Sequence, residues 1–359
     1  MFKEGMTLDE ILKIEIPEDR VDRLKELVSF DIPDLSDEVA RFLLKQQIQV
    51  VNIQYARFLA GVKFTEADVD NLMKGAIDIH AHGGSDPFDR LLLEDEIAMD
   101  YSRAGMRAVV FKTWFTPSAS RNQLVQKYLD IWAQGNEVEP VKIFGGITLN
   151  KPVGGINPDA VKRCLGFPGS KYVWMPMVDS YHHRRIVYDD WSGEGLRIVD
   201  DKGRCLPEMS EVLRIAADND LIVASGHFPY VEHKAVFEEA IRLGVKRMEI
   251  IHPAHIHCKT SIEQMKEAAS EGIKLMLSGL GTTTFPQHET GPVYAVKMIK
   301  EVGARHFVYG SDYGQIHNPS HVVGTRWLIK LLLAYGATTE EVQQIFQISP
   351  AEHLGLERG

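Results

Sequence analysis

The sequence AIDIHAHGGSDPF occupies residues 76–88 and places two histidines close together. An alternating apolar and polar run over 76–80 predicts a short strand that ends in His80, and one small residue separates this histidine from His82. Side chains two apart on a strand point to the same side. We therefore expect both imidazoles at the end of a first core strand, facing one cation.

Short β-branched runs recur along the chain from this point, and amphipathic, helix-like segments separate them. This alternation predicts a parallel sheet with right-handed crossovers. About eight such units close a barrel, and HAHGG at 80–84 is not the glycine-rich phosphate loop of an open, doubly wound sheet. We therefore predict an α/β protein with a (β/α)₈ TIM-like barrel. The predicted strands are 76–80, 106–112, 141–147, 171–178, 221–227, 247–252, 273–279 and 306–312, and helix-like segments include 93–105, 210–220 and 261–272.

Residues 1–74 differ from the rest because they show helical patterns only. Capping-box sequences begin at Thr7 and Thr65, and no catalytic candidate lies in this part. We predict an N-terminal helical extension over 1–74, which covers one face of the barrel or forms a subunit contact. The barrel domain then spans 75–359.

The composition is that of a globular protein, with 44% hydrophobic and 25% charged residues in a chain of 359. The formal net charge is −10 and basic residues form no run, which argues against nucleic acid as a partner. No window reaches the roughly 18–20 apolar residues that a membrane helix needs. We therefore expect a soluble protein that acts on a small molecule, with no nucleic-acid or membrane partner.

The three cysteines, Cys164, Cys205 and Cys258, are too few and too far apart for a disulfide framework. The start of the chain lacks the apolar segment of a secretory signal. Both features predict a cytoplasmic protein. The N-terminal helices and the apolar stretch WLIKLLLAYG, residues 327–336, favour a homo-oligomer.

Polar residues also stand where other predicted strands end. His227 ends the fifth strand, His252 the sixth and Asp312 the eighth. A barrel carries its chemistry at the C-terminal ends of its strands, where the loops converge. Any one of these histidines alone would more often be structural. Four strand ends that each carry a nitrogen or oxygen ligand favour a metal site.

In this ordered set of ligands the chain resembles the amidohydrolase superfamily of metal-dependent (β/α)₈ hydrolases, over about residues 75–350. The resemblance implies that His80, His82 and Asp312 hold one metal ion. It also implies that Asp312 is a catalytic residue, which takes the proton from the metal-bound water.

The resemblance further implies that His227 and His252 serve a second metal or the substrate, and it makes His252 a second catalytic candidate. Independently of the family, imidazoles and a carboxylate suit Zn²⁺, which lowers the pKa of a bound water toward ~7. We therefore expect a divalent metal cofactor, Zn²⁺ first and Mn²⁺, Fe²⁺ or Co²⁺ as alternatives, with one or two ions per chain.

The end of the fourth strand departs from the superfamily pattern. Many two-metal members carry a bridging lysine or glutamate there, whereas this strand runs into WMPMVDSYHH at 174–183. Lys112, at the end of the second strand, offers a substitute. Two interpretations stay open: a carbamate of Lys112 bridges two metals, or the protonated amine contacts an anionic substrate or pairs with Asp312. Both make Lys112 a catalytic candidate, and the carbamate also makes it a metal-ligand candidate.

Cationic and aromatic residues near the predicted mouth indicate a small, anionic substrate. The stretch HPAHIHC at 252–258 adds His255 and His257, which we interpret as loop residues because Cys258 has no partner at zinc-finger spacing. The substrate-binding candidates are Arg90, His182, His183 and Trp114.

Residues 180–208 are too long for a simple turn between a strand and a helix. A small hairpin around 201–203 is expected within them. Arg184 and Arg185 add positive charge beside the predicted mouth, but pairing with the acidic residues at 189–190 is the favoured interpretation for these two.

The leading functional hypothesis is a metal-dependent hydrolase that cleaves an amide, lactam, lactone or ester of a small, anionic molecule. The alternative on the same fold is a mononuclear-metal, non-oxidative decarboxylase or lyase. A barrel that binds metal or a ligand without catalysis is a third hypothesis, and the position of the polar residues on the catalytic face argues against it.

Overall fold

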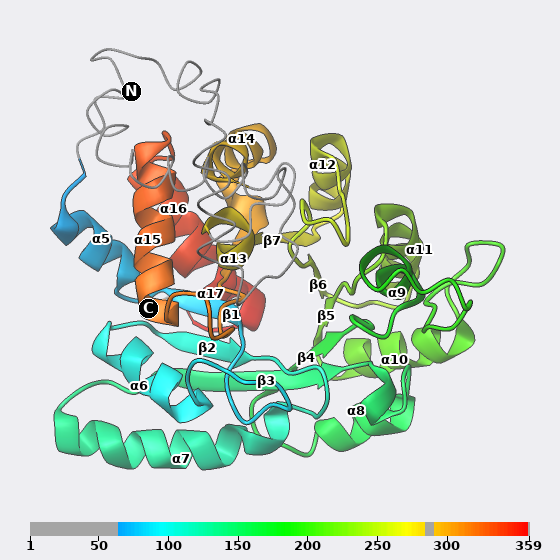
Figure 1. The fold of residues 1–359 in the computed structure, drawn as a ribbon, viewed down its shortest axis with the longest axis horizontal. Coiled ribbons are helices and arrows are strands. Elements are labelled where there is room, and N and C mark those ends of the chain that lie inside the picture. Colours follow the sequence, from blue (N-terminus) through cyan, green and yellow to red (C-terminus); the bar gives the residue numbers. More distant parts are fainter. Residues whose placement is uncertain (1–63, 284–290, 358–359) are drawn as a thin grey trace, which may run out of the picture.

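The computed structural model describes residues 64–283 and 291–357. Eight parallel strands form one sheet in the order β1 to β8, which curls into a nearly closed barrel surrounded by helices (Figure 1). The predicted (β/α)₈ architecture is confirmed, and every strand overlaps its predicted run. The strands are β1 (Ile77–Ala81), β2 (Ala108–Phe111), β3 (Lys142–Thr148), β4 (Ser170–Trp174), β5 (Ile222–Ala224), β6 (Arg247–Ile250), β7 (Lys274–Ser278) and β8 (Phe307–Gly310).

The helices pack on the outside of the sheet, and α7 runs along the outer side of β3 at the bottom of Figure 1. Within the described ranges, none of them combines the length and apolarity needed to cross a membrane. The α-helices are α5 (Glu66–Met73), α6 (Glu94–Arg103), α7 (Ala119–Asn136), α8 (Pro158–Cys164), α9 (Tyr181–Val187), α10 (Pro207–Asp218), α11 (Tyr230–Arg242), α12 (Ile262–Ser270), α13 (Gly279–Thr283), α14 (Pro292–Val302), α15 (His321–Ala334), α16 (Thr339–Gln343) and α17 (Ser349–Leu354).

Helix α12 shows how the sequence specifies these outer helices. Ser261 Oγ accepts the N–H of Gln264 (3.3 Å), and the Gln264 side chain accepts the N–H of Ser261 (2.9 Å), which closes a capping box. Ile262 and Met265 are spaced by three residues and are both buried against the barrel. The helical segment predicted over 261–272 is therefore confirmed.

The barrel interior is filled with side chains. Ile77 and Ile79 of β1 and Val308 of β8 pack there with the stacked rings of Tyr172 and Trp174, whose centroids lie 4.8 Å apart. A second, larger apolar layer lies between the sheet and the helices. Because the centre is a packed core, chemistry belongs at the C-terminal ends of the strands.

Strands β1 and β8 meet through backbone hydrogen bonds at their C-terminal ends. The N–H of Asp312 donates to the carbonyl of His80 (2.8 Å), and the N–H of His82 donates to the carbonyl of Tyr313 (3.0 Å). These bonds bring the two ends of the sheet together. They also fix three predicted ligands at one edge of the barrel.

A register irregularity in β1 determines where its first histidine points. The pairing with β2 shifts between Asp78 and Ala81. Strict alternation would turn Asp78 and His80 to the same side. Asp78 instead faces α6, where the Tyr101 hydroxyl donates to its carboxylate (2.5 Å), while the His80 ring lies 6.2 Å from the ring of Trp174 inside the barrel. The irregularity thus directs His80 into the mouth of the barrel.

Helix α5 begins at the predicted capping box. Thr65 Oγ1 accepts the N–H of Asp68 (3.2 Å), and the Asp68 carboxylate accepts the N–H of Thr65 (2.6 Å). The helix packs on α15, where Arg326 pairs with Asp70 (2.5 Å). The capping box at Thr7 and the rest of the predicted extension before residue 64 lie outside the described residues.

The apolar stretch 327–336 forms most of α15 and is buried within one chain. Leu328, Ile329 and Leu332 on this helix are fully buried in the layer outside the sheet. Packing within one chain therefore accounts for the apolar residues of this stretch. The homo-oligomer stays a prediction.

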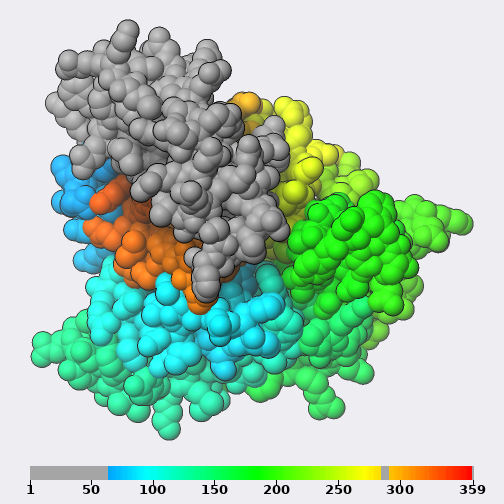
Figure 2. All heavy atoms as spheres, in the orientation of Figure 1, coloured from blue at the N-terminus to red at the C-terminus, as the bar shows by residue number. Residues whose placement is uncertain are grey.

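The segment between β4 and α10 forms α9 and the predicted small hairpin. Val199 and Cys205 form an antiparallel bridge, and the N–H of Asp200 donates to the carbonyl of Arg204 (2.8 Å). In Figure 2 this green segment stands out on the right side of the molecule.

All three cysteines carry free thiols, in agreement with the predicted lack of a disulfide framework.

Candidate metal centre

Three of the predicted ligands, His80, His82 and Asp312, form a first cluster at the ends of β1 and β8. Their ligand atoms all lie within 4.8 Å of one another. Asp312 Oδ1 lies 3.2 Å from His82 Nε2 and 3.5 Å from His80 Nε2. Two ligand atoms on one tetrahedral zinc ion lie about 3.3 Å apart, given bonds of about 2.0–2.1 Å. These separations match a shared cation.

The hydrogen bonding of His82 supports a cation at this position. His82 Nδ1 lies 2.9 Å from the carbonyl oxygen of Lys112, which can only accept, so Nδ1 carries the proton. In the neutral ring, Nε2 then presents a lone pair to the Asp312 carboxylate at 3.2 Å. Two acceptors that face each other need a positive ion between them. The donor set therefore fits a divalent metal, with the outer nitrogen oriented as in many metal-ligating histidines.

Asp78 holds the two ligand strands in register beneath the first cluster. Its Oδ1 accepts the N–H of His80 (3.0 Å) and the N–H of Ser311 (2.8 Å), and its Oδ2 accepts the hydroxyl of Tyr101 (2.5 Å). Asp312 itself adopts a φ of +56°, a conformation that is uncommon for residues other than glycine. Such backbone conformations persist where the surrounding contacts determine them, and they concentrate at functional sites.

The electrostatics of the first cluster favour metal-binding protonation states. Burial, reinforced by the positive charge of Lys112, holds the pKa of His80 well below its ordinary value, and burial also lowers the pKa of His82. Burial opposes ionisation of Asp312, but the neighbouring imidazoles of His82, His80 and His252 hold its pKa well below the usual range. Neutral imidazoles beside a carboxylate are the forms that bind Zn²⁺.

Lys112 lies against the first cluster. Its Nζ is 3.2 Å from His80 Nε2 and 5.9 Å from the centre of the Trp174 ring, and its side chain is buried. Burial lowers the pKa of Lys112 to about 7, although the charges of Asp312 and Glu249 act in the opposite direction. A substantial fraction of neutral amine is thus present near neutral pH.

A second cluster consists of His183, His227 and His257. Their ligand atoms also lie within 4.8 Å of one another, and the Nδ1 atoms of His227 and His183 are 2.8 Å apart. The family resemblance paired His227 with His252 as residues that serve a second metal or the substrate. In the structure the His252 ring lies between the clusters, 5.2 Å from the ring of His227 and 6.5 Å from that of His80.

His257 is a loop residue, as interpreted from the sequence, and its ring lies beside His183 and His227. The loop after β6 folds back over the strand ends, and its Cys258 thiol lies 3.7 Å from the carbonyl oxygen of Gly226, beside His227. The sequence did contain a signal for this cluster, because three histidines stand close together at positions 252, 255 and 257. No periodicity indicated that this loop would fold back toward β5.

Two substrate-binding candidates lie close to His82. The Arg90 guanidinium is already paired with Asp86, through Nε at 2.9 Å and Nη2 at 2.5 Å, so it has a structural partner. Trp114 packs edge-on against His82, with centroids 5.9 Å apart, and against Phe88 at 5.7 Å. Trp114 thus forms an apolar wall beside the first cluster.

The remaining candidates lie on α9. His183 belongs to the second cluster, whereas the His182 side chain contacts the backbone of His257. Arg184 pairs with Asp190, as favoured from the sequence. The same expectation for Arg185 is wrong: its guanidinium stacks over the ring of Trp191, 4.2 Å from the centroid.

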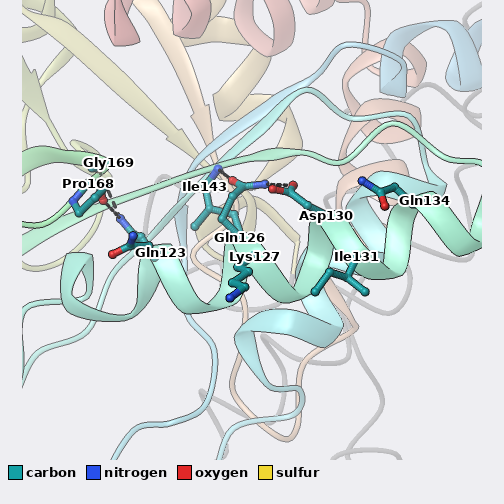
Figure 3. Close-up of a pocket in the computed structure, with 10 residues that line it drawn as sticks. Gln123, Gln126, Lys127, Asp130, Ile131, Gln134, Ile143, Pro168 and Gly169 are labelled. Carbon is teal, nitrogen blue, oxygen red and sulfur yellow. Dashed lines mark hydrogen bonds between the residues drawn. The ribbon is translucent and has the colours of Figure 1, made fainter.

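Figure 3 shows a surface hollow that lies far from this chemistry. It has a volume of about 380 Å³ and runs along α7, where Ile143 of β3 and Pro168 and Gly169 before β4 also line it. Gln126 there donates to Asp130 Oδ1 (2.9 Å) and accepts the N–H of Ile143 (2.9 Å). Ile143 stands near the start of β3, so the hollow adjoins the N-terminal ends of the strands. Barrel active sites occupy the opposite ends.

Solved structures with this fold include amidohydrolases and a lactonase. An amidohydrolase from Pseudomonas aeruginosa is 14% identical, covers 81% of this chain and 98% of its own, and has a TM-score of 0.54. An amidohydrolase from Mycoplasma synoviae is 15% identical over 80% of this chain and 89% of its own, with a TM-score of 0.54. A lactonase from Listeria monocytogenes is 13% identical over 79% and 95%, with a TM-score of 0.53.

The chain therefore shares its barrel fold with these amidohydrolases and this lactonase, which confirms the fold that the resemblance implied. Residues 75–276 match a family described as being of unknown function, DUF6282, and the chain belongs to that family. No curated protein matches the chain.

Proposed function

We propose that this protein is a metal-dependent hydrolase that cleaves a C–N or C–O bond in a small, anionic amide, lactam, lactone or ester. The observation that carries the proposal is the convergence of His80, His82 and Asp312 at the C-terminal ends of β1 and β8. The fold that the chain shares with amidohydrolases and a lactonase is consistent with it.

His80 Nε2, His82 Nε2 and Asp312 Oδ1 are the atoms that would hold the metal, with zinc as the first candidate. A divalent cation bound there supplies Lewis acidity toward a carbonyl and lowers the pKa of a water molecule. Asp312 is the carboxylate placed to accept a proton from the attacking water and to return it to the leaving nitrogen or oxygen.

Lys112 is proposed to act as an unmodified lysine beside this metal site. Its Nζ adjoins His80, and the second cluster contains three imidazoles without it. As an ammonium, the side chain can hold an anionic oxygen of the substrate. Trp114 and Phe88 supply an apolar wall on the other side of His82, and His252 lies between the two clusters where a substrate group would contact it.

The test is product analysis with a panel of anionic lactones, amides and esters in water enriched in heavy oxygen. Hydrolysis adds one labelled oxygen to the product, whereas decarboxylation releases CO₂ and gives a lighter product. We expect label incorporation by the zinc-loaded enzyme and a loss of at least about 100-fold in kcat for Asp312→Asn.

A matched control is Asp130→Asn on α7, which lies at the opposite end of the barrel and should keep full turnover. Turnover of Asp312→Asn at the wild-type rate with bound metal would remove Asp312 from the proton transfer. Release of CO₂ without label incorporation would replace the hydrolase by the decarboxylase.

A further inference from the structure

We propose that the second cluster is a metal site in its own right, in which His183, His227 and His257 bind a zinc-like transition-metal ion through imidazole nitrogens alone. This inference goes beyond the proposed function, because it concerns a second cation and would hold whatever reaction the first cluster supports. It also replaces the ligand pair His227 and His252 that the sequence indicated.

The positions of the three rings carry the proposal. The Nδ1 atoms of His183 and His227 are 2.8 Å apart, and ring centroids lie 4.1 Å apart for His227 and His257 and 4.7 Å apart for His183 and His257. Nitrogens on one zinc ion lie about 3.3 Å apart. One nitrogen of each ring lies within 4.8 Å of the others, and the rings of His183 and His257 stack on His227 with interplanar angles of 23° and 13°, so binding of a common ion requires the rings to turn toward it. The rings come from three separate segments: α9, the end of β5 and the loop after β6.

A buried hydroxyl ties two of these ligands together. Ser180 Oγ caps α9 by accepting the N–H of His183 (3.0 Å), and it donates to the carbonyl of His227 (2.7 Å). Ser180 is fully buried. One side chain therefore sets the backbone positions of both residues, which is how supporting residues hold metal ligands in place.

Close packing at Gly226 fixes the third ligand relative to the second. A Cβ at Gly226 would lie 2.1 Å from the carbonyl oxygen of Pro176, so the ends of β4 and β5 approach closely only because this residue is glycine. The Cys258 thiol beside His257 lies 3.7 Å from the Gly226 carbonyl. Pro176, which follows β4, and Cys258, which follows His257, thus both lie against Gly226 at the end of β5.

The chemistry of the ligands selects the ion. The second cluster contains three imidazoles and no carboxylate, whereas Mg²⁺ and Ca²⁺ prefer oxygen ligands. Imidazole suits zinc, copper, iron and nickel, and three histidines with one open position form a known type of zinc coordination. The first cluster contains a carboxylate, so the two sites should differ in metal preference.

The two sites are separate in the described part of the chain. His252 is the residue between them, and its ring contacts both His80 and His227. Lys112 touches the first cluster through His80. Each cluster has its own three ligands, so neither site needs the other to bind an ion.

Zinc stoichiometry of the full chain tests this inference. The protein is stripped with a chelator, reloaded with zinc sulfate and freed of excess zinc, and zinc per chain is measured by plasma mass spectrometry. We expect about two ions for the wild type, about one for His257→Ala and about one for the double variant His80→Ala/His82→Ala. His255→Ala is the matched control, since His255 lies in the same loop outside the cluster, and it should keep about two.

Circular dichroism confirms folding of each variant, and His183→Ala supplies the same comparison if His257→Ala does not fold. Full zinc content in a folded His257→Ala or His183→Ala protein would overturn the inference. A single wild-type ion that disappears in His80→Ala/His82→Ala would also overturn it, while leaving the proposed hydrolase intact. A single ion that survives that double variant but is lost in His257→Ala would support the second site and count against the proposed function.

Discussion

The hydrogen bond from His82 Nδ1 to the carbonyl oxygen of Lys112 decides which nitrogen of the ring faces Asp312. Buried side chains also fix the backbone at other candidate sites. Asp78 does so for His80 and Ser311, and Ser180 does so for His183. Sequence patterns indicated the ligand types at the strand ends. They did not indicate the orienting partners, which lie far away along the chain.

Asp78→Asn is expected to weaken metal binding at the first cluster without removing a ligand. The amide keeps one acceptor oxygen, so the variant cannot accept all three hydrogen bonds, which come from His80 in β1, Ser311 after β8 and Tyr101 in α6. Loss of an orienting partner typically costs 10–100-fold in metal affinity, and we expect a rise in the zinc Kd of about that size. Competition with a chromophoric chelator measures it. Tyr101→Phe removes only the hydrogen bond to Oδ2 and shows how much of the change in Kd comes from that contact. An unchanged Kd in Asp78→Asn would refute the positioning role.

Lys112→Met is expected to lower kcat by at least about 100-fold while the zinc content stays at the wild-type value. The amine would be lost from the proposed substrate contact, but the three ligands of the first cluster would remain. Turnover and plasma mass spectrometry on the same preparation separate the two effects. Lys127→Met, at an exposed position on α7, is the control. A parallel loss of zinc would instead indicate a carbamate of Lys112 as a metal ligand.

At the scale of elements, the strands were predictable because each is a short β-branched run between helical patterns. His80 was expected on the same side as His82, but the register irregularity between Asp78 and Ala81 that turns it inward was not predictable. Helix α9 was also missed, since its seven residues lie in an irregular segment. The second cluster depends on that helix and on the folded-back loop after β6. The first cluster was predictable because its ligands stand directly at strand ends.

Two glycine substitutions test the packing of these elements. Gly226→Ala would place a Cβ 2.1 Å from a backbone carbonyl, and we expect the free energy of unfolding to fall by more than about 2 kcal/mol. A Cβ added at Gly135 in α7 would have no atom within 4 Å. Gly135→Ala should therefore raise the free energy of unfolding by roughly 0.5–1 kcal/mol, because alanine is the better helix former. Urea titration measures both. Equal effects of the two substitutions would contradict the close approach of β4 and β5.

For the whole molecule, buried histidines make stability depend on pH. His233 is fully buried on α11, and burial lowers its pKa from 6.5 to about 3. Unfolding exposes this ring, so the unfolded chain binds a proton below about pH 6.5 that the folded chain excludes. The stabilisation is complete above that pH and is lost progressively between about 6.5 and 3.

His233→Leu should therefore flatten the fall of the unfolding free energy over this range, by up to about 1.4 kcal/mol per pH unit. Urea titrations at a series of pH values between 7 and about 4.5 measure the slope. His317→Leu replaces an exposed histidine and should leave it unchanged. A slope in His233→Leu equal to that of the wild type would show that this ring does not contribute.

The meeting of β1 and β8 also imposes an order on biosynthesis. A ribosome makes His80 and His82 early, but Asp312 is joined to the chain more than two hundred residues later. Domains generally fold as units, so the first cluster lacks its carboxylate while more than two hundred residues are added after His82. The ligands of the second cluster are all present once His257 has been added. The nascent chain thus contains every ligand of the second cluster before it contains the last ligand of the first.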